Sequence, residues 1–371
     1  MKTALITGAN GFMGKNMLAA LKKQDNIEVL MFNRDDNPAL LQKHLEKADI
    51  VYHFAGVNRP ENNEKFELVN AGLTKTMADS LENMAKKPVI VLASSVQAML
   101  DNPYGKSKKH AEDILIQYAE KTGGQIHIYR LPNVFGKWCR PNYNSVVATF
   151  CHNISHDLDI VISDENRELE LVYIDDVISK FVKILTQPES YKAMVYGEII
   201  PRYKITLGEL AKKVYELKNI RSSLTIPDMN DSLTRCLYAT YLSYLDKKDF
   251  SYTLDMKTDQ RGWLAELIKS RHFGQIFVSK THAGVVRGNH FHNSKVEKFC
   301  VIQGEAVVKF RHILNGEILN YPVSGDKIEV LDIPPGYTHS IENTGKKELI
   351  TLFWAGEMFD PEKPDTFFEK V

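Results

Sequence analysis

Residues 104–108 read Tyr-Gly-Lys-Ser-Lys, which places the phenol of Tyr104 and the amine of Lys108 four residues apart. On a helix such a pair shares one face, so the two groups would lie close together. A neighbouring ammonium stabilises a phenolate, which would adapt Tyr104 to exchange a proton near neutral pH. Ser94 and Ser95 lie at the end of the preceding predicted strand, where a hydroxyl can hydrogen-bond a substrate carbonyl. A Tyr–Lys pair alone is common on ordinary helix surfaces, but this combination predicts proton transfer to a carbonyl oxygen.

A glycine-rich turn follows directly after the first predicted strand, residues 4–6. Its small residues let the backbone approach a pyrophosphate, and the start of the next helix offers free N–H groups. The spacing is G-x-x-G-x-x-G, and its place after a strand makes it a stronger indication than the glycines alone. The residues assigned to this dinucleotide site are Gly8, Asn10, Gly11, Phe12, Met13 and Gly14.

The end of the second predicted strand bears on the choice between NAD and NADP. An NAD site usually places an acid there for the ribose hydroxyl groups, whereas Asn33 and Arg34 stand at this place here. A guanidinium can bind a 2′-phosphate, so the sequence favours NADP. Asp35 follows at once, however, and the plainer interpretation is that Arg34 is a solvated loop charge.

Three histidines and a glutamate in the last third of the chain have the spacing of a metal site. His290 and His292 are two residues apart on a predicted strand, so their side chains point to one face. Glu297 follows a turn, and His339 belongs to a different strand pair. Zinc is the first choice for such a ligand set, and iron, manganese and nickel are the alternatives. A single histidine would be better explained as a core or surface residue, but the four residues together favour a metal.

Alternating strands and helices must position the glycine turn, the two serines and the Tyr104–Lys108 pair. Predicted buried strands at 4–6, 27–32, 50–54, 89–93 and 126–130 alternate with helix patterns such as 15–23, 73–84 and 107–120. This order predicts an α/β Rossmann-type, doubly wound parallel sheet over residues 1–245. Beyond a polar stretch at 246–249, short strands with turn signals such as Asn315-Gly316 predict an all-β barrel over residues 246–371.

Composition excludes several classes of protein. Lysine plus arginine equals aspartate plus glutamate at 47 each, which argues against a nucleic-acid or membrane-surface binder. The four cysteines are far apart and form no C-x-x-C pair, as expected for reduced thiols in a cytoplasmic protein. The N-terminus lacks the pattern of a signal peptide, and no apolar run approaches the roughly 20 residues of a membrane span.

Residues 1–245 resemble the extended short-chain dehydrogenase/reductase family, which includes nucleotide-sugar epimerases and reductases. The matching segments are the glycine turn, residues 49–56, 69–72, 94–95, 104–108, 130–136 and 173–177. The resemblance implies that Asp49 lies near the adenine and that Lys108 also holds the nicotinamide ribose. It further implies a turn that lines the cofactor, made of His53, Phe54, Ala55 and Gly56, in which His53 is given no acid–base role. The family usually has a longer insert between serine and tyrosine; Ser95 is favoured over Ser94 as the catalytic serine.

Residues 270–355 resemble both motifs of the cupin superfamily, whose fold is a jelly-roll barrel. Residues 284–290 and 333–339 also resemble sugar-nucleotide 3,5-epimerases, which are cupins that use a histidine without a metal to remove a proton next to a 4-keto group. Because His292 and Glu297 complete a metal site here, His290 is either a ligand or the base. If it is a ligand, the metal would polarise the ketone as a Lewis acid, and the base stays unidentified.

The whole chain, domain order included, resembles bifunctional enzymes of capsular polysaccharide synthesis. The resemblance implies a UDP-linked 4-keto-6-deoxy-N-acetylhexosamine, epimerised at C3 by the cupin and reduced at C4 with NADPH on the route to UDP-N-acetyl-L-fucosamine. It also suggests a homodimer. The residues alone support only a ketone, a nicotinamide and a metal. The alternatives, in order, are a reductase with a non-catalytic cupin for sugar binding or dimerisation, a non-enzymatic sensor, and a cupin dioxygenase.

Overall fold

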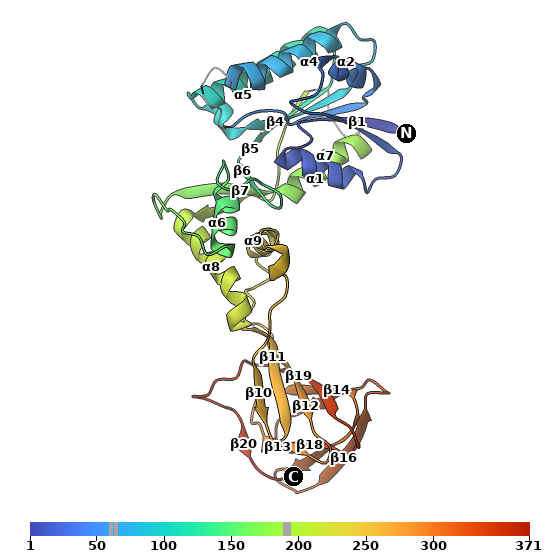
Figure 1. Ribbon diagram of the computed structural model, residues 1–371, viewed down its shortest axis with the longest axis vertical. Helices are drawn as coiled ribbons and strands as arrows, with labels where there is room; N and C mark the ends of the chain where they lie inside the picture. The colour runs from blue at the N-terminus through green and yellow to red at the C-terminus, as the bar shows by residue number, and fades with distance from the viewer. Residues whose placement is uncertain (59–61, 63–65, 188–193) are drawn as a thin grey trace. The chain divides into compact units, whose positions relative to one another are not determined.

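The computed structural model describes residues 1–58, 62, 66–187 and 194–371 (Figure 1). The chain divides into two compact units, Met1–Val214 with Cys236–Leu245 and Tyr215–Arg235 with Asp246–Val371. Unlike the predicted boundary at residue 245, this division assigns a short earlier segment to the second unit. The reason is visible in the backbone: the N–H of Ile226 donates to the carbonyl of Lys269, and the N–H of Lys269 donates to that of Leu224.

The first unit contains a six-stranded sheet in which every neighbouring pair is parallel. Its order is β2-β1-β3-β4-β5-β8, so the chain winds outward in both directions from β1 and β3, the kind of switch point at which nucleotides bind in doubly wound sheets. The strands are β1 (Lys2–Thr7), β2 (Ile27–Phe32), β3 (Ile50–His53), β4 (Val89–Ser95), β5 (Ile126–Leu131) and β8 (Met194–Gly197). The predicted Rossmann-type sheet is therefore confirmed.

Helices cover both faces of this sheet (Figure 1). Strand β1 shows why, because Ala4 and Ile6 point into one apolar core and Leu5 into the other, as the alternation of side chains along a strand requires. The first core is covered by α1 (Phe12–Leu21) and α7 (Ile174–Thr186), and the second by α2 (Pro38–Lys47), α4 (Gly72–Glu82) and α5 (Pro103–Thr122).

Smaller elements complete the helical part of the chain. A three-stranded sheet has the order β6-β7-β9. The remaining elements before the β-rich part are η1 (Glu67–Ala71), η2 (Val96–Met99), β6 (Asn133–Phe135), α6 (Val146–Ser155), β7 (Glu168–Tyr173), β9 (Tyr203–Thr206), α8 (Leu207–Ser223), α9 (Ser232–Leu242) and η4 (Lys247–Asp249). Across the described ranges, the structure contains no helix with the length and hydrophobicity of a membrane span.

The β-rich part consists of two antiparallel sheets, with the orders β10-β11-β12-β19-β14-β17 and β16-β15-β18-β13-β20. Phe299 and Phe353 of the first sheet and Phe310 and Ile341 of the second share one apolar core, so the predicted all-β fold is confirmed. The predicted turn at Asn315-Gly316 joins β15 to β16. The strands are β10 (Met256–Asp259), β11 (Gly262–Ser270), β12 (Gly274–Thr281), β13 (Val286–Phe291), β14 (Glu297–Gln303), β15 (Glu305–His312), β16 (Ile318–Ser324), β17 (Val330–Ile333), β18 (Tyr337–Asn343), β19 (Leu349–Ala355) and β20 (Phe367–Phe368).

Candidate active site and metal centre

The glycine turn between β1 and α1 is packed so closely that side chains do not fit at two positions. A Cβ on Gly14 would lie 2.3 Å from the carbonyl oxygen of Gly8, and a Cβ on Gly8, whose φ is +71°, would lie 2.9 Å from the nitrogen of Ala55. Gly11 stands before the first residue of α1, and no side chain caps that end of the helix. The turn therefore offers a close backbone approach and helical N–H groups to an anion, which fits the pyrophosphate of a dinucleotide.

The loop after β2 lies beside this turn. The N–H of Asn10 donates to Oδ1 of Asn33 at 2.9 Å, and the N–H of Asn33 donates to Oδ2 of Asp36 at 2.7 Å. Arg34 is exposed, and in the described part of the chain it forms no ion pair. Arg34, which the sequence predicted for a 2′-phosphate, follows Asn33 in this loop and is not used by a neighbouring acid in the described part of the chain.

The ring of His53, the last residue of β3, is buried and connects other elements of the first unit through hydrogen bonds. The hydroxyl of Thr74 donates to the carbonyl of Asn70 at 2.7 Å, so its oxygen accepts from Nε2–H of His53 at 2.9 Å. Nδ1 of His53 then accepts from the hydroxyl of Thr7 at 2.7 Å. Burial, with a smaller effect of Lys108, lowers the pKa of His53 to about 3, so the ring is neutral. His53 ties β1, β3 and α4 together, which agrees with giving it no acid–base role.

The placement of Asp49 corrects a prediction. Its carboxylate accepts the N–H of Thr3 at 2.6 Å and pairs with Lys86 at 2.8 Å, both at the amino ends of the parallel strands. The glycine turn lies at the carboxyl ends, and the strand between them, β3, has four residues or about 13 Å of length. Asp49 is therefore on the wrong edge of the sheet to lie near an adenine. The sequence contained this signal, since Asp49 directly precedes the predicted strand at 50–54, and the residue before a strand of a parallel sheet lies at its amino edge.

Tyr104 lies at the start of α5, and its phenol is close enough to Ser95 at the end of β4 for the serine to affect the pKa of the phenol. The helix begins there because Oδ1 of Asn102 accepts the N–H of Gly105 at 2.8 Å, an N-cap. Burial raises the pKa of Tyr104 to about 12, with the nearby Ser95 working in the opposite direction. The phenol is consequently protonated at neutral pH, which suits a proton donor.

Ser94 has a different partner. Its hydroxyl donates to Oε1 of the fully buried Glu112 at 2.5 Å, and the same carboxylate accepts from Nε and Nη2 of Arg130 at 3.0 and 2.6 Å. The hydroxyl of Ser94 is thus committed to Glu112, whereas Ser95, the last residue of β4, lies close to Tyr104. This geometry supports Ser95, the serine favoured from the sequence. Glu112 was missed, although its place four residues after Lys108 puts it on the same helix face.

Lys108 lies beside the turn at residues 53–56 rather than against the phenol. Its Nζ donates to the carbonyl of Ala93 at 3.0 Å, and a Cβ on Gly56 would lie 3.6 Å from that Nζ. Burial lowers the pKa of Lys108 to about 8, opposed by the charge of Glu112. Ser95, and not Lys108, is the group that opposes the effect of burial on the pKa of Tyr104 in this structure.

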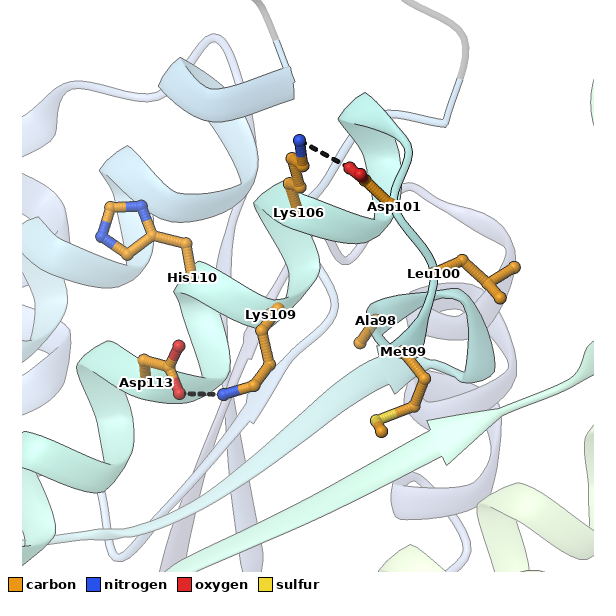
Figure 2. Close-up of a pocket in the computed structure, with 8 residues that line it drawn as sticks. All are labelled: Ala98, Met99, Leu100, Asp101, Lys106, Lys109, His110 and Asp113. Carbon is orange, nitrogen blue, oxygen red and sulfur yellow. Dashed lines mark hydrogen bonds and ion pairs between the residues drawn. The ribbon is translucent and has the colours of Figure 1, made fainter.

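A hollow on the outer surface of α5 is separate from this site (Figure 2). At 3.6 residues per turn, positions 106, 109 and 113 lie on the opposite side of the helix from 104 and 108. Its charges are paired with each other, Lys106 with Asp101 at 2.6 Å and Lys109 with Asp113. The lining residues are Ala98, Met99, Leu100, Asp101, Lys106, Lys109, His110 and Asp113.

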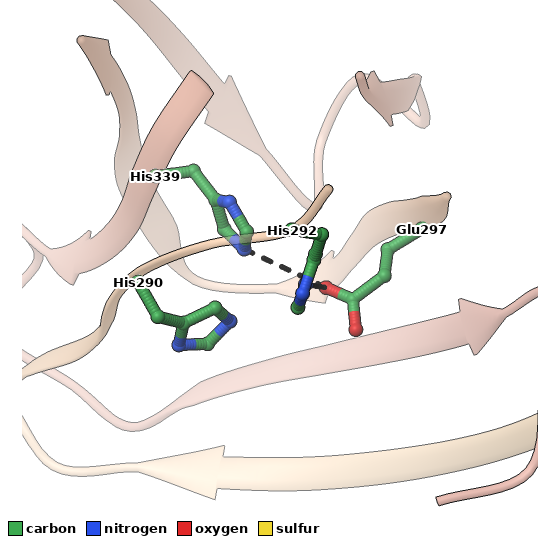
Figure 3. Close-up of side chains that lie close together, drawn as sticks. All are labelled: His290, His292, Glu297 and His339. Atoms are coloured by element: carbon green, nitrogen blue, oxygen red, sulfur yellow. Dashed lines mark ion pairs between the residues drawn. The ribbon is translucent and has the colours of Figure 1, made fainter. Parts of the chain in front are cut away.

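Four side chains converge inside the β-rich unit (Figure 3). His290 lies on β13, His292 just after it, Glu297 at the start of β14 and His339 on β18, and one ligand atom from each lies within 4.8 Å of all the others. Oε2 of Glu297 is 3.3 Å from Nε2 of His292 and 3.5 Å from Nε2 of His339. The structure thus brings together all four of the predicted metal ligands.

The hydrogen bonds of two histidines determine where their lone pairs point. Nδ1 of His292 lies 2.5 Å from the carbonyl oxygen of Asp365, and Nδ1 of His339 lies 3.3 Å from that of Tyr337. A carbonyl only accepts, so Nδ1 carries the proton and Nε2 carries a lone pair in both rings. Both Nε2 atoms are buried without a hydrogen-bond partner and face a carboxylate oxygen. Buried acceptors that face one another fit a divalent cation between them.

Known proteins match both parts of the chain. Residues 4–197 match the model of the NAD dependent epimerase/dehydratase family, and residues 257–367 match that of the polysaccharide biosynthesis C-terminal domain. UDP-2-acetamido-2,6-beta-L-arabino-hexul-4-ose reductase of Pseudomonas aeruginosa is 44% identical over 363 residues, which cover 98% of this chain and 97% of that protein.

Solved structures agree with these matches. The capsular polysaccharide assembling protein CapF from Staphylococcus aureus is 44% identical with a TM-score of 0.92, over 99% of this chain and 100% of that one. UDP-glucuronic acid 4-epimerase from Bacillus cereus, in complex with UDP-glucuronic acid and NAD, is 17% identical with a TM-score of 0.54, over 65% of this chain and 98% of that one. The second likeness shows the fold alone. The first confirms the resemblance to capsular polysaccharide synthesis enzymes.

Proposed function

The chain belongs to the NAD dependent epimerase/dehydratase family, and we propose that it is a bifunctional nucleotide-sugar enzyme of polysaccharide synthesis. Its first unit reduces the C4 ketone of a UDP-linked 4-keto-6-deoxy-N-acetylhexosamine with NADPH. Its β-rich unit, a cupin, epimerises C3 of the same sugar. The two reactions together would lead toward UDP-N-acetyl-L-fucosamine.

The observation that carries the reductase is the placement of Tyr104 close to Ser95 at the carboxyl edge of the sheet, the edge that bears the glycine turn. NADPH, when bound, supplies a hydride to the ketone carbon. Tyr104 donates its proton to the ketone oxygen, so the carbonyl becomes a secondary alcohol. Ser95 orients that oxygen, and Lys108 beside Gly56 holds the ribose of the cofactor. The phenol is protonated at neutral pH, as a proton donor must be.

The choice of NADP rests on Arg34. It is exposed at the end of β2, while Asn33 is occupied by the N–H of Asn10. A 2′-phosphate would therefore meet a guanidinium and no carboxylate committed to the ribose hydroxyl groups.

The epimerase half follows from the acidity of a carbon next to a ketone. Removal and return of the C3 proton inverts that carbon, and reduction of the ketone then ends the acidity and preserves the new configuration. A divalent ion, for which we propose zinc, would supply a Lewis acid that polarises the ketone. His290, His292, Glu297 and His339 would hold it, and His290 serves better as a ligand than as the base because its ring centroid lies 4.5 Å from that of His339. Burial lowers the pKa of His290 to about 4, which keeps the ring neutral for this role.

We further propose a cytoplasmic homodimer. The four cysteines form no disulfide with one another, as expected of a reducing compartment. A second function deserves a direct test, because the Pseudomonas aeruginosa relative is named for a reductase alone. In that case the cupin would bind sugar or join subunits without exchanging a proton.

Proton exchange distinguishes the two functions. With a UDP-4-keto sugar in D₂O, Tyr104→Phe should lower NADPH oxidation by about 10²–10⁴-fold, the usual contribution of a general acid. Deuterium should still enter C3 in this variant. His290→Ala should stop the exchange but leave NADPH oxidation with a pre-epimerised sugar intact. An absence of deuterium in Tyr104→Phe would show that the protein is a reductase only.

A further inference from the structure

The segment of residues 365–371, which we call the strap, runs along the metal centre although it is far from the ligands in the sequence. Its strand β20 pairs antiparallel with β13, with Phe368 opposite His290 and Phe367 opposite Phe291. The rings of Phe291 and Phe367 stack with centroids 5.2 Å apart. The strap is thus an added edge strand beside β13, which carries His290 and leads directly to His292.

Asp365, at the beginning of the strap, contacts the metal centre in two ways. Its carbonyl oxygen accepts the Nδ1 proton of His292 at 2.5 Å. Its carboxylate accepts the N–H groups of Asn293, Ser294 and Lys295 at 3.0, 2.8 and 2.8 Å, and the hydroxyl of Ser294 at 3.0 Å. One residue therefore holds both the ring of His292 and the turn that leads from this ligand toward Glu297.

The other end of the strap braces the bulge that precedes His290. The register of β13 shifts between Gly288 and His290, and Asn289 has a φ of +62°, which is uncommon for a residue other than glycine. The carbonyl of Asn289 accepts the N–H of Glu369 at 2.9 Å, and its Oδ1 accepts the N–H of Val371 at 3.3 Å. These bonds stabilise the conformation that turns His290 into the cluster.

The strap is also anchored on β15, which is separated from β13 by β18 in the same sheet. Nε and Nη2 of Arg311 donate to the carbonyl of Lys370 at 3.1 and 2.8 Å, and the same guanidinium pairs with Glu369. Lys295 also reaches the strap, with its Nζ 3.0 Å from the hydroxyl oxygen of Thr366. The strap is therefore held by β15 and also by Lys295, which lies between the ligands His292 and Glu297 in the sequence.

We propose that the strap positions the metal ligands and that Asp365 is its principal positioning residue. The partner of a ligating imidazole fixes the proton on the far nitrogen and orients the ring, and its loss typically weakens metal binding by roughly 10–100-fold. The proposal rests on the metal centre of the proposed function. The strap would raise the affinity of that centre without contributing an atom to the ligand set.

Zinc affinity, measured on the full chain by competition with a chromophoric chelator, tests the proposal. We expect deletion of residues 365–371, which removes the carbonyl that accepts from His292, to weaken zinc binding about 10–100-fold. Asp365→Asn keeps that carbonyl and loosens only the turn at residues 293–295, so it should weaken zinc binding by less than the deletion and by more than the control. Asp259→Asn is the matched control, since Asp259 also accepts a backbone N–H, from Arg261 at 2.9 Å, in a turn of the same unit. Its zinc affinity should stay within about 3-fold, because no bond to a ligand changes.

A second readout separates positioning from general destabilisation. The visible spectrum of bound Co²⁺ reports the geometry of the ligands, and it should change in Asp365→Asn but not in Asp259→Asn. For a variant that folds only when metal is bound, the zinc concentration at which it folds gives its zinc affinity. If Asp365→Asn and the deletion both bound zinc with the affinity of the unmodified chain and both kept its cobalt spectrum, the role of the strap would be overturned. If the unmodified chain bound neither ion, the metal centre itself would be refuted.

Discussion

The ion pair of Glu112 and Arg130 allows a sharp test of how the fold supports the end of β4. The side chain of Glu112 is 0% exposed and that of Arg130 is 26% exposed. Glu112 accepts hydrogen bonds of 3.0, 3.2 and 2.6 Å from Arg130, one of 2.5 Å from Ser94 and one of 3.4 Å from the hydroxyl of Tyr196. Glu112→Gln keeps the shape of the side chain but removes its charge and one acceptor.

Removing one member of a buried ion pair costs roughly 3–5 kcal/mol. Arg130 reaches water over a quarter of its surface, so the free energy of unfolding should fall by an amount near the lower end, about 3 kcal/mol. For a unit of this size 1 kcal/mol changes Tm by roughly 2–4 °C, so Glu112→Gln should lower the Tm of the first unit by about 6–12 °C.

The next residue provides a matched control. Asp113 pairs with Lys109 on the same helix, but their side chains are 42% and 41% exposed. Asp113→Asn should therefore cost at most about 1 kcal/mol. Thermal unfolding followed by circular dichroism and by calorimetry measures both variants. If the two variants had the same Tm, the reasoning that burial makes the Glu112–Arg130 pair contribute more to stability would be refuted.

Two further predictions concern the cofactor side of the site. Arg34→Ala should lower kcat/KM for NADPH by about 10–150-fold, because a hydrogen bond to a charged group contributes roughly 1.5–3 kcal/mol, and it should leave kcat/KM for NADH nearly unchanged; an equal loss with both nucleotides would contradict a 2′-phosphate site at Arg34. Burial lowers the pKa of Lys108 to about 8 from its ordinary value of about 10.4, so the folded state binds fewer protons than the unfolded state between these values. The free energy of unfolding should therefore rise with pH from about 8 to about 10.4. Measured by urea unfolding over that range, this rise should be smaller for Lys108→Met than for the unmodified chain.

Local patterns in the sequence were sufficient for the fold class and for most of the candidate site. The glycine turn after a buried strand, the Tyr104–Lys108 pair on one helix face and the His290–His292 pair on one strand face all follow from backbone geometry over a few residues. The convergence of His290, His292, Glu297 and His339 was predicted from the resemblance of two separate motifs to a known fold, and the structure brings these residues together.

Local patterns of this kind do not predict contacts between segments that are far apart in the sequence. The partner that separates Ser94 from Ser95 depends on how a strand and a helix 18 residues apart in the chain pack together. The contact of Asp365 with His292 joins residues 73 positions apart.

The sequence by itself determined which side chains share a face, because the periodicity of a helix or strand is a property of the local backbone. Only the tertiary structure decided which faces meet, because that depends on the order of strands in a sheet and on the course of loops, which are selected by the burial of apolar surface over the whole unit. For this reason the ligands and the phenol could be named in advance, whereas the groups that hold them in place, Glu112 beneath β4 and the strap beside β13, became visible only in the folded chain.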